Sequence, residues 1–98
     1  MYIIRETFTS KPGHASRLAK LFKGAFGQAP NVRIMTDMVA DYNTVIMEMQ
    51  VNSLAEFEKQ MEGYKSGGHP DMDPKVAEEM SKYAEMYVTG KREIFRIE

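Results

Sequence analysis

The sequence contains no cysteine, and its charges are nearly balanced. Without cysteine, disulfides, thiolate metal clusters and cysteine nucleophiles are excluded. The 13 basic and 14 acidic side chains give a formal net charge of −1, whereas proteins that bind nucleic acid or membrane surfaces rely on clustered positive charge. No apolar run approaches the ~20 residues of a membrane span, and the first residues lack the pattern of a secretory signal. We therefore expect a cytoplasmic protein that binds neither nucleic acid nor membranes.

The chain has 98 residues, which is enough for one domain over residues 1–98 and too few for two. Methionine is unusually common, with nine copies spread along the chain from Met1 to Met86 and not gathered in one motif. This spread favours the filling of irregular gaps in a core over ligation of copper or haem. No spacing of histidines and carboxylates resembles a metal site, so we expect no metal and no cofactor.

The first half of the sequence predicts a strand, a helix and a hairpin. Residues 2–9 are rich in β-branched and aromatic types, as strands are, and Lys11-Pro12-Gly13 ends this run. Residues 14–26 place apolar side chains at helical spacing, which predicts a helix lying on a core. Residues 32–39 and 44–51 read as two strands joined by a turn at Asp41-Tyr42-Asn43.

The second half predicts two helices and a final strand. Ser53 and Glu56 match a capping box, which marks the start of a helix. Asp73 is the expected N-cap of the next helix, with Pro74 at its first position. Apolar residues continue at helical spacing to Tyr87, and Thr89-Gly90 is expected to end that helix. Residues 91–97 read as the last strand.

This order of elements is that of an α+β protein with the split β-α-β pattern of ferredoxin-like folds, in which helices cover one face of a four-stranded antiparallel sheet. A monomer should then have a polar second face. The predicted strands instead carry apolar residues in both registers, for example Ile3 beside Ile4 and Ile94 beside Phe95. A twofold homodimer with sheets packed face to face would cover the second apolar face.

The whole chain resembles the dimeric α+β barrel superfamily, and within it the small NIPSNAP-like and antibiotic-monooxygenase-like (ABM-like) proteins. The segments that carry the resemblance are Thr9-Ser10-Lys11-Pro12-Gly13, Val51-Asn52-Ser53-Leu54-Ala55-Glu56-Phe57 and Gly90-Lys91-Arg92-Glu93-Ile94-Phe95-Arg96-Ile97. The resemblance implies a barrel made from the sheets of two subunits, with a ligand pocket between the sheet and the helices of each. Relatives include cofactor-free oxygenases of polycyclic phenols, haem-degrading enzymes, and small isomerases or lyases. The chain departs from the haem-degrading pattern because it has no tryptophan and because Arg5 and Glu6 stand where that pattern has an asparagine.

Arg5 and Glu6 are the first candidate catalytic residues. They are neighbours on a strand, so their side chains point to opposite faces, and an enclosed charge needs a partner. Glu6 is a candidate base and Arg5 a candidate clamp for an anionic substrate. The alternative is a structural ion pair across strands, with partners such as Glu48, Glu93 or Arg96.

His69 is the third catalytic candidate, because it lies in a glycine-flanked loop and a histidine can exchange protons near neutral pH. The alternative is an exposed loop histidine. Aromatic and methionine side chains on the helical stripes would either fill the core or line a pocket against the sheet. The candidate ligand-binding residues are Phe22, Phe57, Tyr64, Met80 and Tyr83.

These observations leave the role of the protein open between two main classes, and they do not settle whether it is an enzyme. The first is a homodimeric domain that binds a small apolar or aromatic molecule between sheet and helices. The second is a cofactor-independent monooxygenase or isomerase acting on a small aromatic substrate. A cavity of ~300 Å³ or more beside Arg5 and Glu6 would favour the enzyme, whereas a filled core with Glu6 paired would favour the binding domain.

Overall fold

The computed structural model describes residues 1–65 and 74–98, apart from the side chains of residues 63–65 and 76. The elements in chain order are β1 (Tyr2–Ser10), α1 (Ala15–Phe26), β2 (Val32–Thr36), β3 (Thr44–Val51), α2 (Leu54–Lys65), α3 (Pro74–Met80), the 3₁₀ helix η1 (Tyr83–Glu85) and β4 (Tyr87–Arg96). The sheet order is β2-β3-β1-β4, and every neighbouring pair is antiparallel. This is the ferredoxin-like arrangement that the sequence predicts.

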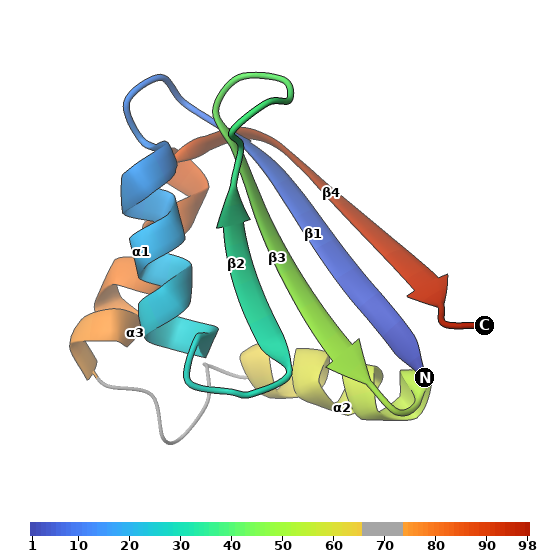
Figure 1. The fold of residues 1–98 in the computed structure, drawn as a ribbon. Helices are drawn as coiled ribbons and strands as arrows, with labels where there is room; N and C mark the ends of the chain where they lie inside the picture. Colours follow the sequence, from blue (N-terminus) through green and yellow to red (C-terminus); the bar gives the residue numbers. More distant parts are fainter. Residues whose placement is uncertain (66–73) are drawn as a thin grey trace.

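The helices gather on one face of the sheet (Figure 1). Helix α1 packs against β2, β3 and β1 and also against α3, whereas α2 contacts β3 at the end of the sheet that holds both chain termini. We call the face that α1 covers the helix side and the opposite face the open side. No helix in the described part of the chain is both long enough and apolar enough to cross a membrane.

The centre of the core lies between α1 and the two middle strands. Phe8 of β1 and Val45 of β3 are register partners, and they pack against Leu18 and Phe22 of α1. The rings of Phe8 and Phe22 are 5.1 Å apart between centroids. Burying each such side chain contributes about 1.5–3 kcal/mol, so this cluster fixes the position of α1 on the sheet. The helical stripe predicted over residues 14–26 is thereby confirmed.

The start of α2 confirms the predicted capping box. The backbone N–H of Glu56 donates to Ser53 Oγ at 3.2 Å, and the Glu56 carboxylate accepts from the backbone N–H of Asn52 at 3.2 Å. Two amides at the helix start, which have no partner within the helix, are thus satisfied by side chains.

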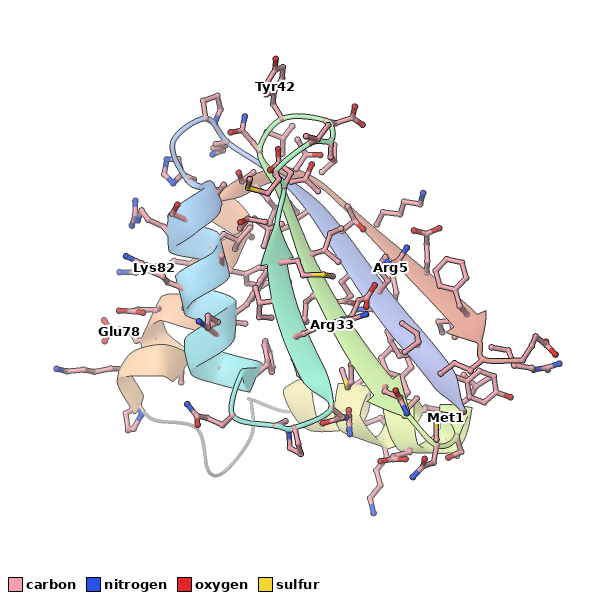
Figure 2. The ribbon with its side chains drawn as sticks, in the orientation of Figure 1. Met1, Arg5, Arg33, Tyr42, Glu78 and Lys82 are labelled. Atoms are coloured by element: carbon pink, nitrogen blue, oxygen red, sulfur yellow. The ribbon has the colours of Figure 1, made fainter. Side chains whose placement is uncertain are left out.

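The β2–β3 hairpin differs from its prediction in length. Strand β2 ends at Thr36 instead of residue 39, so Met38 and Val39 lie in the connecting loop, where each is 96% exposed. The loop ends at Asn43, which has a φ of 63°, and its base is closed by the Thr44 N–H donating to Asp37 Oδ1 at 2.9 Å. The aspartate side chain replaces a ladder bond, and this turn chemistry ends the strand early. Tyr42 stands at the tip of the loop (Figure 2).

The junction of α3 and β4 was predicted wrongly. The helix ends at Met80, seven residues before Tyr87, and β4 begins at Tyr87. Gly90 does not stop a helix but lies within β4 opposite Phe8. A Cβ atom at Gly90 would lie 3.3 Å from Phe8 Cε1, so the absence of a side chain there leaves room for the Phe8 ring. The predicted N-cap Asp73 lies outside the described residues.

Candidate functional site

A first candidate site lies on the helix side, where β1 and β4 carry an ion pair. Glu6 and Arg92 are register partners, and Arg92 Nε donates to Glu6 Oε1. The Arg92 guanidinium also lies 5.6 Å from the ring centroid of Phe57 on α2, a cation–π distance. The pair therefore connects the edge of the sheet to α2.

Tyr83 of η1 brings a phenol to the same region. Burial raises the pKa of Tyr83, and Tyr87 and the negative charge of Glu6 raise it further, whereas Arg92 lowers it. The Tyr83 and Tyr87 rings lie 5.6 Å apart, and Phe8 is edge-on to both. The helix side thus presents a carboxylate, a guanidinium and two phenols against an aromatic wall. We call Glu6, Phe57, Tyr83, Tyr87 and Arg92 the helix-side cluster.

The structure brings together several residues that the sequence singled out. Glu6 and Phe57 are joined through Arg92, while Phe22 and Met80 pack with Tyr83 around the core. Phe22 is fully buried, so it supports the aromatic wall rather than facing an opening. His69 lies outside the described residues, as does the side chain of Tyr64. Their predicted roles stay predictions.

Arg5 lies on the open side, away from the other candidates. Its Nε donates to Glu48 Oε2 at 2.7 Å, and Arg33 donates to Glu48 Oε1 through Nε at 2.9 Å and Nη2 at 2.7 Å. Glu48 is a buried charged residue, with 5% of its side chain exposed. Burial raises the pKa of Glu48, but the hydrogen bonds from Arg33 and Arg5 and their positive charges outweigh it and hold that pKa below its ordinary value. Both Arg5 and Glu6 form ion pairs with residues on neighbouring strands, which is the alternative that the sequence left open to a catalytic role.

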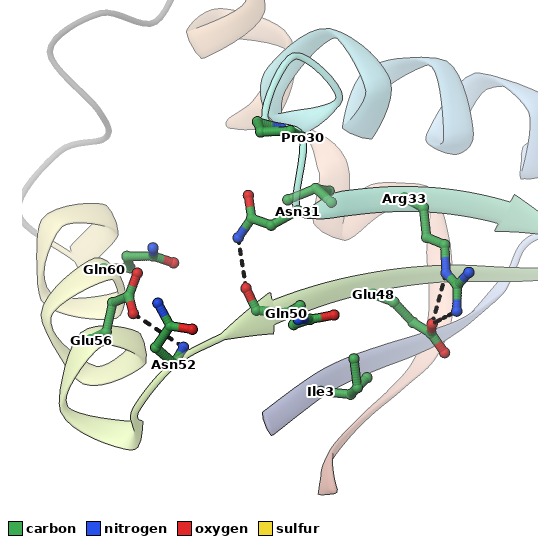
Figure 3. A pocket seen from close by; sticks show the side chains of 10 residues that line it. Ile3, Pro30, Asn31, Arg33, Glu48, Gln50, Asn52, Glu56 and Gln60 are labelled. Carbon is green, nitrogen blue, oxygen red and sulfur yellow. Dashed lines mark hydrogen bonds and ion pairs between the residues drawn. The ribbon is translucent and has the colours of Figure 1, made fainter. Parts of the chain in front are cut away.

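A groove of about 680 Å³ opens beside this ion pair network at one end of the sheet (Figure 3). It lies between the start of β2, the end of β3 and the first turns of α2. Its lining is polar and rich in amide side chains: Ile3, Pro30, Asn31, Val32, Arg33, Glu48, Gln50, Asn52, Glu56 and Gln60. The groove borders Glu48, the partner of Arg5, and its lining residues Ile3, Arg33 and Gln50 lie on the face of the sheet opposite to Glu6.

Three features of these candidate sites were not singled out in the sequence. Arg92 is the partner of Glu6, and the alternation of β4 was the signal that places it on the same face. Glu48 was named only as a partner for Arg5, although a lone acid in the otherwise apolar run 45–49 signals an enclosed charge. The groove gave no sequence signal because its lining comes from separate segments. Among the described residues, no group of three or more histidines and carboxylates is placed to hold a metal ion.

Comparisons with known proteins identify the fold. No protein-family model matches the sequence, and no curated protein matches it significantly. Solved structures do match: an uncharacterised NIPSNAP domain protein from Burkholderia xenovorans has a TM-score of 0.73 at 12% identity, covering 100% of this chain and 95% of that one. Protein Atu4242 from Agrobacterium tumefaciens has a TM-score of 0.76 at 12% identity, covering 98% and 92%. A NIPSNAP family protein (Atu5224) from the same organism has a TM-score of 0.74 at 10% identity, covering 96% and 82%. The chain therefore has a NIPSNAP-like α+β fold, and at these identities the likeness extends to the fold alone.

Proposed function

We propose that this chain is a homodimeric binding domain that holds a small aromatic or apolar molecule between its sheet and its helices. The observation that carries the proposal is the convergence, in the helix-side cluster, of an ion pair and two phenols on an aromatic wall. Small-molecule sites are mostly apolar with a few placed polar groups, and this cluster has that composition.

The chemistry of the cluster suits a flat ligand with one hydroxyl group. Glu6 accepts hydrogen bonds, Arg92 donates them, and the Phe57 and Tyr83 rings offer faces for stacking. The Glu6 carboxylate is already engaged by Arg92 and is therefore not held free to take a proton from a substrate. This pairing favours binding over catalysis.

The homodimer is supported by the open side of the sheet. Register places four apolar side chains there, one on each strand: Ile3, Met35, Ile46 and Phe95. Phe95 is 43% exposed. Apolar residues on the uncovered face of a sheet are sheltered when two sheets pack face to face.

The ligand proposal is tested by titrating the protein with 2-naphthol and following the fluorescence of the naphthol. We expect saturable binding that is at least about tenfold weaker in Glu6→Gln, since a charge-assisted hydrogen bond is worth about 1.5–3 kcal/mol. Glu58→Gln, at an exposed position on α2, is the matched control and should bind like the unmodified protein. Equal binding by Glu6→Gln and Glu58→Gln would exclude this site. Chemical change of the naphthol during incubation, detected by mass spectrometry, would favour the cofactor-independent enzyme instead.

The dimer is tested separately by size-exclusion chromatography with light scattering. Two copies of an 11.2 kDa chain have a mass of 2 × 11.2 = 22.4 kDa. A mass of 11.2 kDa at all accessible concentrations would refute the homodimer and leave the ligand proposal standing.

A further inference from the structure

The polar groove at the end of the sheet shares no residue with the helix-side cluster. Its volume of about 680 Å³ lies within the range of roughly 300–1,000 Å³ that is usual for small-molecule sites. The whole sequence has six asparagine and glutamine residues, and four of them line this groove: Asn31, Gln50, Asn52 and Gln60. Packing of the core does not explain this gathering of amides, because a buried amide without a partner destabilises a fold.

The floor of the groove lies on the open side of β2 and β3. Arg33 and Glu48 are register partners at one level of the sheet. At the next level, the Gln50 N–H donates to Asn31 O at 3.0 Å, and Asn31 Nδ2 donates to Gln50 O at 2.8 Å. The two levels are two residues apart along each strand, which corresponds to ~7 Å. We call Arg33, Glu48, Asn31 and Gln50 the polar ladder.

The wall of the groove is the start of α2. Asn52, Glu56 and Gln60 follow one another at intervals of four residues, so they form a stripe along one side of this helix and the turn before it. Figure 3 shows these three side chains at one end of the groove, and the polar ladder running away from them along the strands. The strands and the helix thus present two rows of polar groups to the same space.

Several of these side chains are held in place within the chain. Glu48 is bonded on both oxygens, by Arg5 and by Arg33. The Glu56 carboxylate accepts from the backbone N–H of Asn52 at 3.2 Å. Side chains that are already oriented lose less conformational entropy when a ligand binds. The groove is therefore a preorganised site and not a loose collection of surface side chains.

The hydrogen-bonding groups that remain include both donors and acceptors. A side-chain amide carries two N–H donors and one acceptor oxygen. Asn31 uses one of its N–H groups, whereas the side chains of Asn52 and Gln60 form no hydrogen bond within the described part of the chain. Glu56 keeps a second carboxylate oxygen as an acceptor. A ligand that satisfies these groups must itself both donate and accept at several positions.

The charges of the groove favour an uncharged ligand. Arg33 gives its Nε and Nη2 hydrogens to Glu48, so an anion would compete with a carboxylate that is already bound. Both oxygens of Glu48 are occupied, so a cation would compete with two arginines. The apolar part of the lining is small and consists of Ile3, Pro30 and Val32. A wholly apolar ligand would take water from the polar groups without replacing its hydrogen bonds.

A sugar has the properties that this lining requires. Each of its hydroxyl groups both donates and accepts, and the C–H groups of its ring offer a small apolar surface. We infer that the groove binds a neutral carbohydrate, whose hydroxyl groups pair with the polar ladder and with Asn52, Glu56 and Gln60. This is a second site, independent of the aromatic ligand that we propose for the helix-side cluster.

The inference is tested by nitrogen-15 NMR of the side-chain amides during titration with the neutral disaccharides maltose, cellobiose and lactose. The six asparagine and glutamine side chains give separate signals, which single replacements by alanine assign. With at least one sugar, we expect a saturable shift of the four amides that line the groove. Asn43 and Gln28, which do not line it, are internal controls and should not shift. The inference is overturned if no sugar moves the four amides, or if the two controls move with them.

Three further probes distinguish the carbohydrate from other classes of ligand. Inorganic phosphate represents an anion, spermidine a polycation, and tetraglycine an extended peptide. We expect each of them to move the four amides less than the most effective sugar does. A larger saturable shift with any of these probes would assign the groove to that class and overturn the carbohydrate.

Replacement of one amide measures its share in binding. Gln60→Ala removes a side chain that has no hydrogen-bond partner within the described residues, so we expect the variant to fold, which circular dichroism checks. The dissociation constant of the sugar should rise about two- to tenfold, as for the loss of one hydrogen bond. Lys59→Ala, at the neighbouring exposed position on α2, is the matched control and should bind like the unmodified protein. Equal binding by the two variants would show that α2 takes no part and would overturn the inference. The sugar is titrated without naphthol, so this failure would leave the aromatic ligand proposal standing.

Discussion

Replacing Glu48 by glutamine keeps the size of the side chain and removes the negative charge that joins Arg5 to Arg33. The two arginines hold Glu48 through three hydrogen bonds at 2.7–2.9 Å. A hydrogen bond to a charged group contributes about 1.5–3 kcal/mol when it is buried, and an exposed ion pair contributes about 0–1 kcal/mol. Glu48 is buried, whereas the side chains of Arg5 and Arg33 are 40% and 70% exposed. We therefore take the interaction of each arginine with Glu48 to contribute about 1 kcal/mol, between the values for a buried and an exposed pair. We expect Glu48→Gln to lose about 2 kcal/mol of unfolding free energy near neutral pH.

Acid should abolish this difference. The pKa of folded Glu48 is lowered, so its contribution to stability is fully present above the pKa of the unfolded chain and is lost as pH falls through the folded pKa. Once Glu48 is protonated, it is as neutral as the glutamine of the variant. The free energies of the two proteins should therefore converge at low pH, with the unmodified protein falling toward the variant.

Urea denaturation followed by circular dichroism at one chain concentration measures this difference. With a slope of about 1–3 kcal/mol per molar urea, a loss of about 2 kcal/mol lowers the midpoint by roughly 1 M near neutral pH. Glu58→Gln, on the exposed side of α2, is the control and should change stability by less than about 0.5 kcal/mol. If the difference in unfolding free energy between Glu48→Gln and the unmodified protein stayed constant down to low pH, the charge of Glu48 would not be the source of that difference.

Two further predictions concern the turn after β1 and the aromatic wall. Gly13 has a φ of 81° and nothing near the position that a Cβ atom would take. Gly13→Ala should therefore lose about 1 kcal/mol of unfolding free energy from backbone strain alone, measured by the same urea denaturation. An unchanged midpoint would contradict the left-handed conformation of Gly13. Tyr83 has a raised pKa, so it favours the folded state below the unfolded pKa, and this contribution is lost as pH rises through the folded pKa. An absorbance titration should therefore show that Tyr83→Phe removes a phenol that ionises above the ordinary range of tyrosine. Loss of an early-ionising phenol would contradict the burial of Tyr83.

The sequence was sufficient for those parts of the fold in which local signals and burial agree. The strand predicted over residues 44–51 is β3, in which Val45 and Met47 lie on one face and Glu48 on the other. The capping box set the start of α2. The apolar stripe of α1 predicted Leu18 and Phe22 as core residues, and both are buried. Each of these signals is a periodic or local pattern, which a single sequence displays fully.

Prediction from the sequence failed where the secondary structure of a residue depends on a contact with a residue that is distant in the chain. Tyr87 follows Tyr83 at the spacing of one helical turn, which is why the stripe was extended through it, yet the two rings stack from a 3₁₀ turn and a strand. Gly90 is tolerated in the interior of β4 because Phe8 occupies the space above it, a contact across 82 positions (90 − 8). The end of β2 depends on the Asp37 side chain bonding the N–H of Thr44. None of these contacts produces a repeating pattern of residues in the sequence.

The two adjacent charges on β1 show how far a pattern can lead toward function. Arg5 and Glu6 are neighbours on a strand and therefore face opposite sides of the sheet, and the sequence predicted that a charge enclosed on either side needs a partner. Both found one on a neighbouring strand, Glu48 on β3 and Arg92 on β4. A middle strand that served only the core would carry apolar residues on its covered side, since ion pairs there are often no more stabilising than apolar contacts. The proposed ligand site among the helices accounts for Glu6 on the helix side, and the proposed homodimer accounts for Arg5 on the open side. If Arg5 and Glu48 were only structural, the double replacement Arg5→Leu with Glu48→Leu would fold and pair as the unmodified chain does. We expect it to fold but to form larger or mixed assemblies in place of a single homodimer, which light scattering detects, because charges on an exposed sheet face select against other pairings.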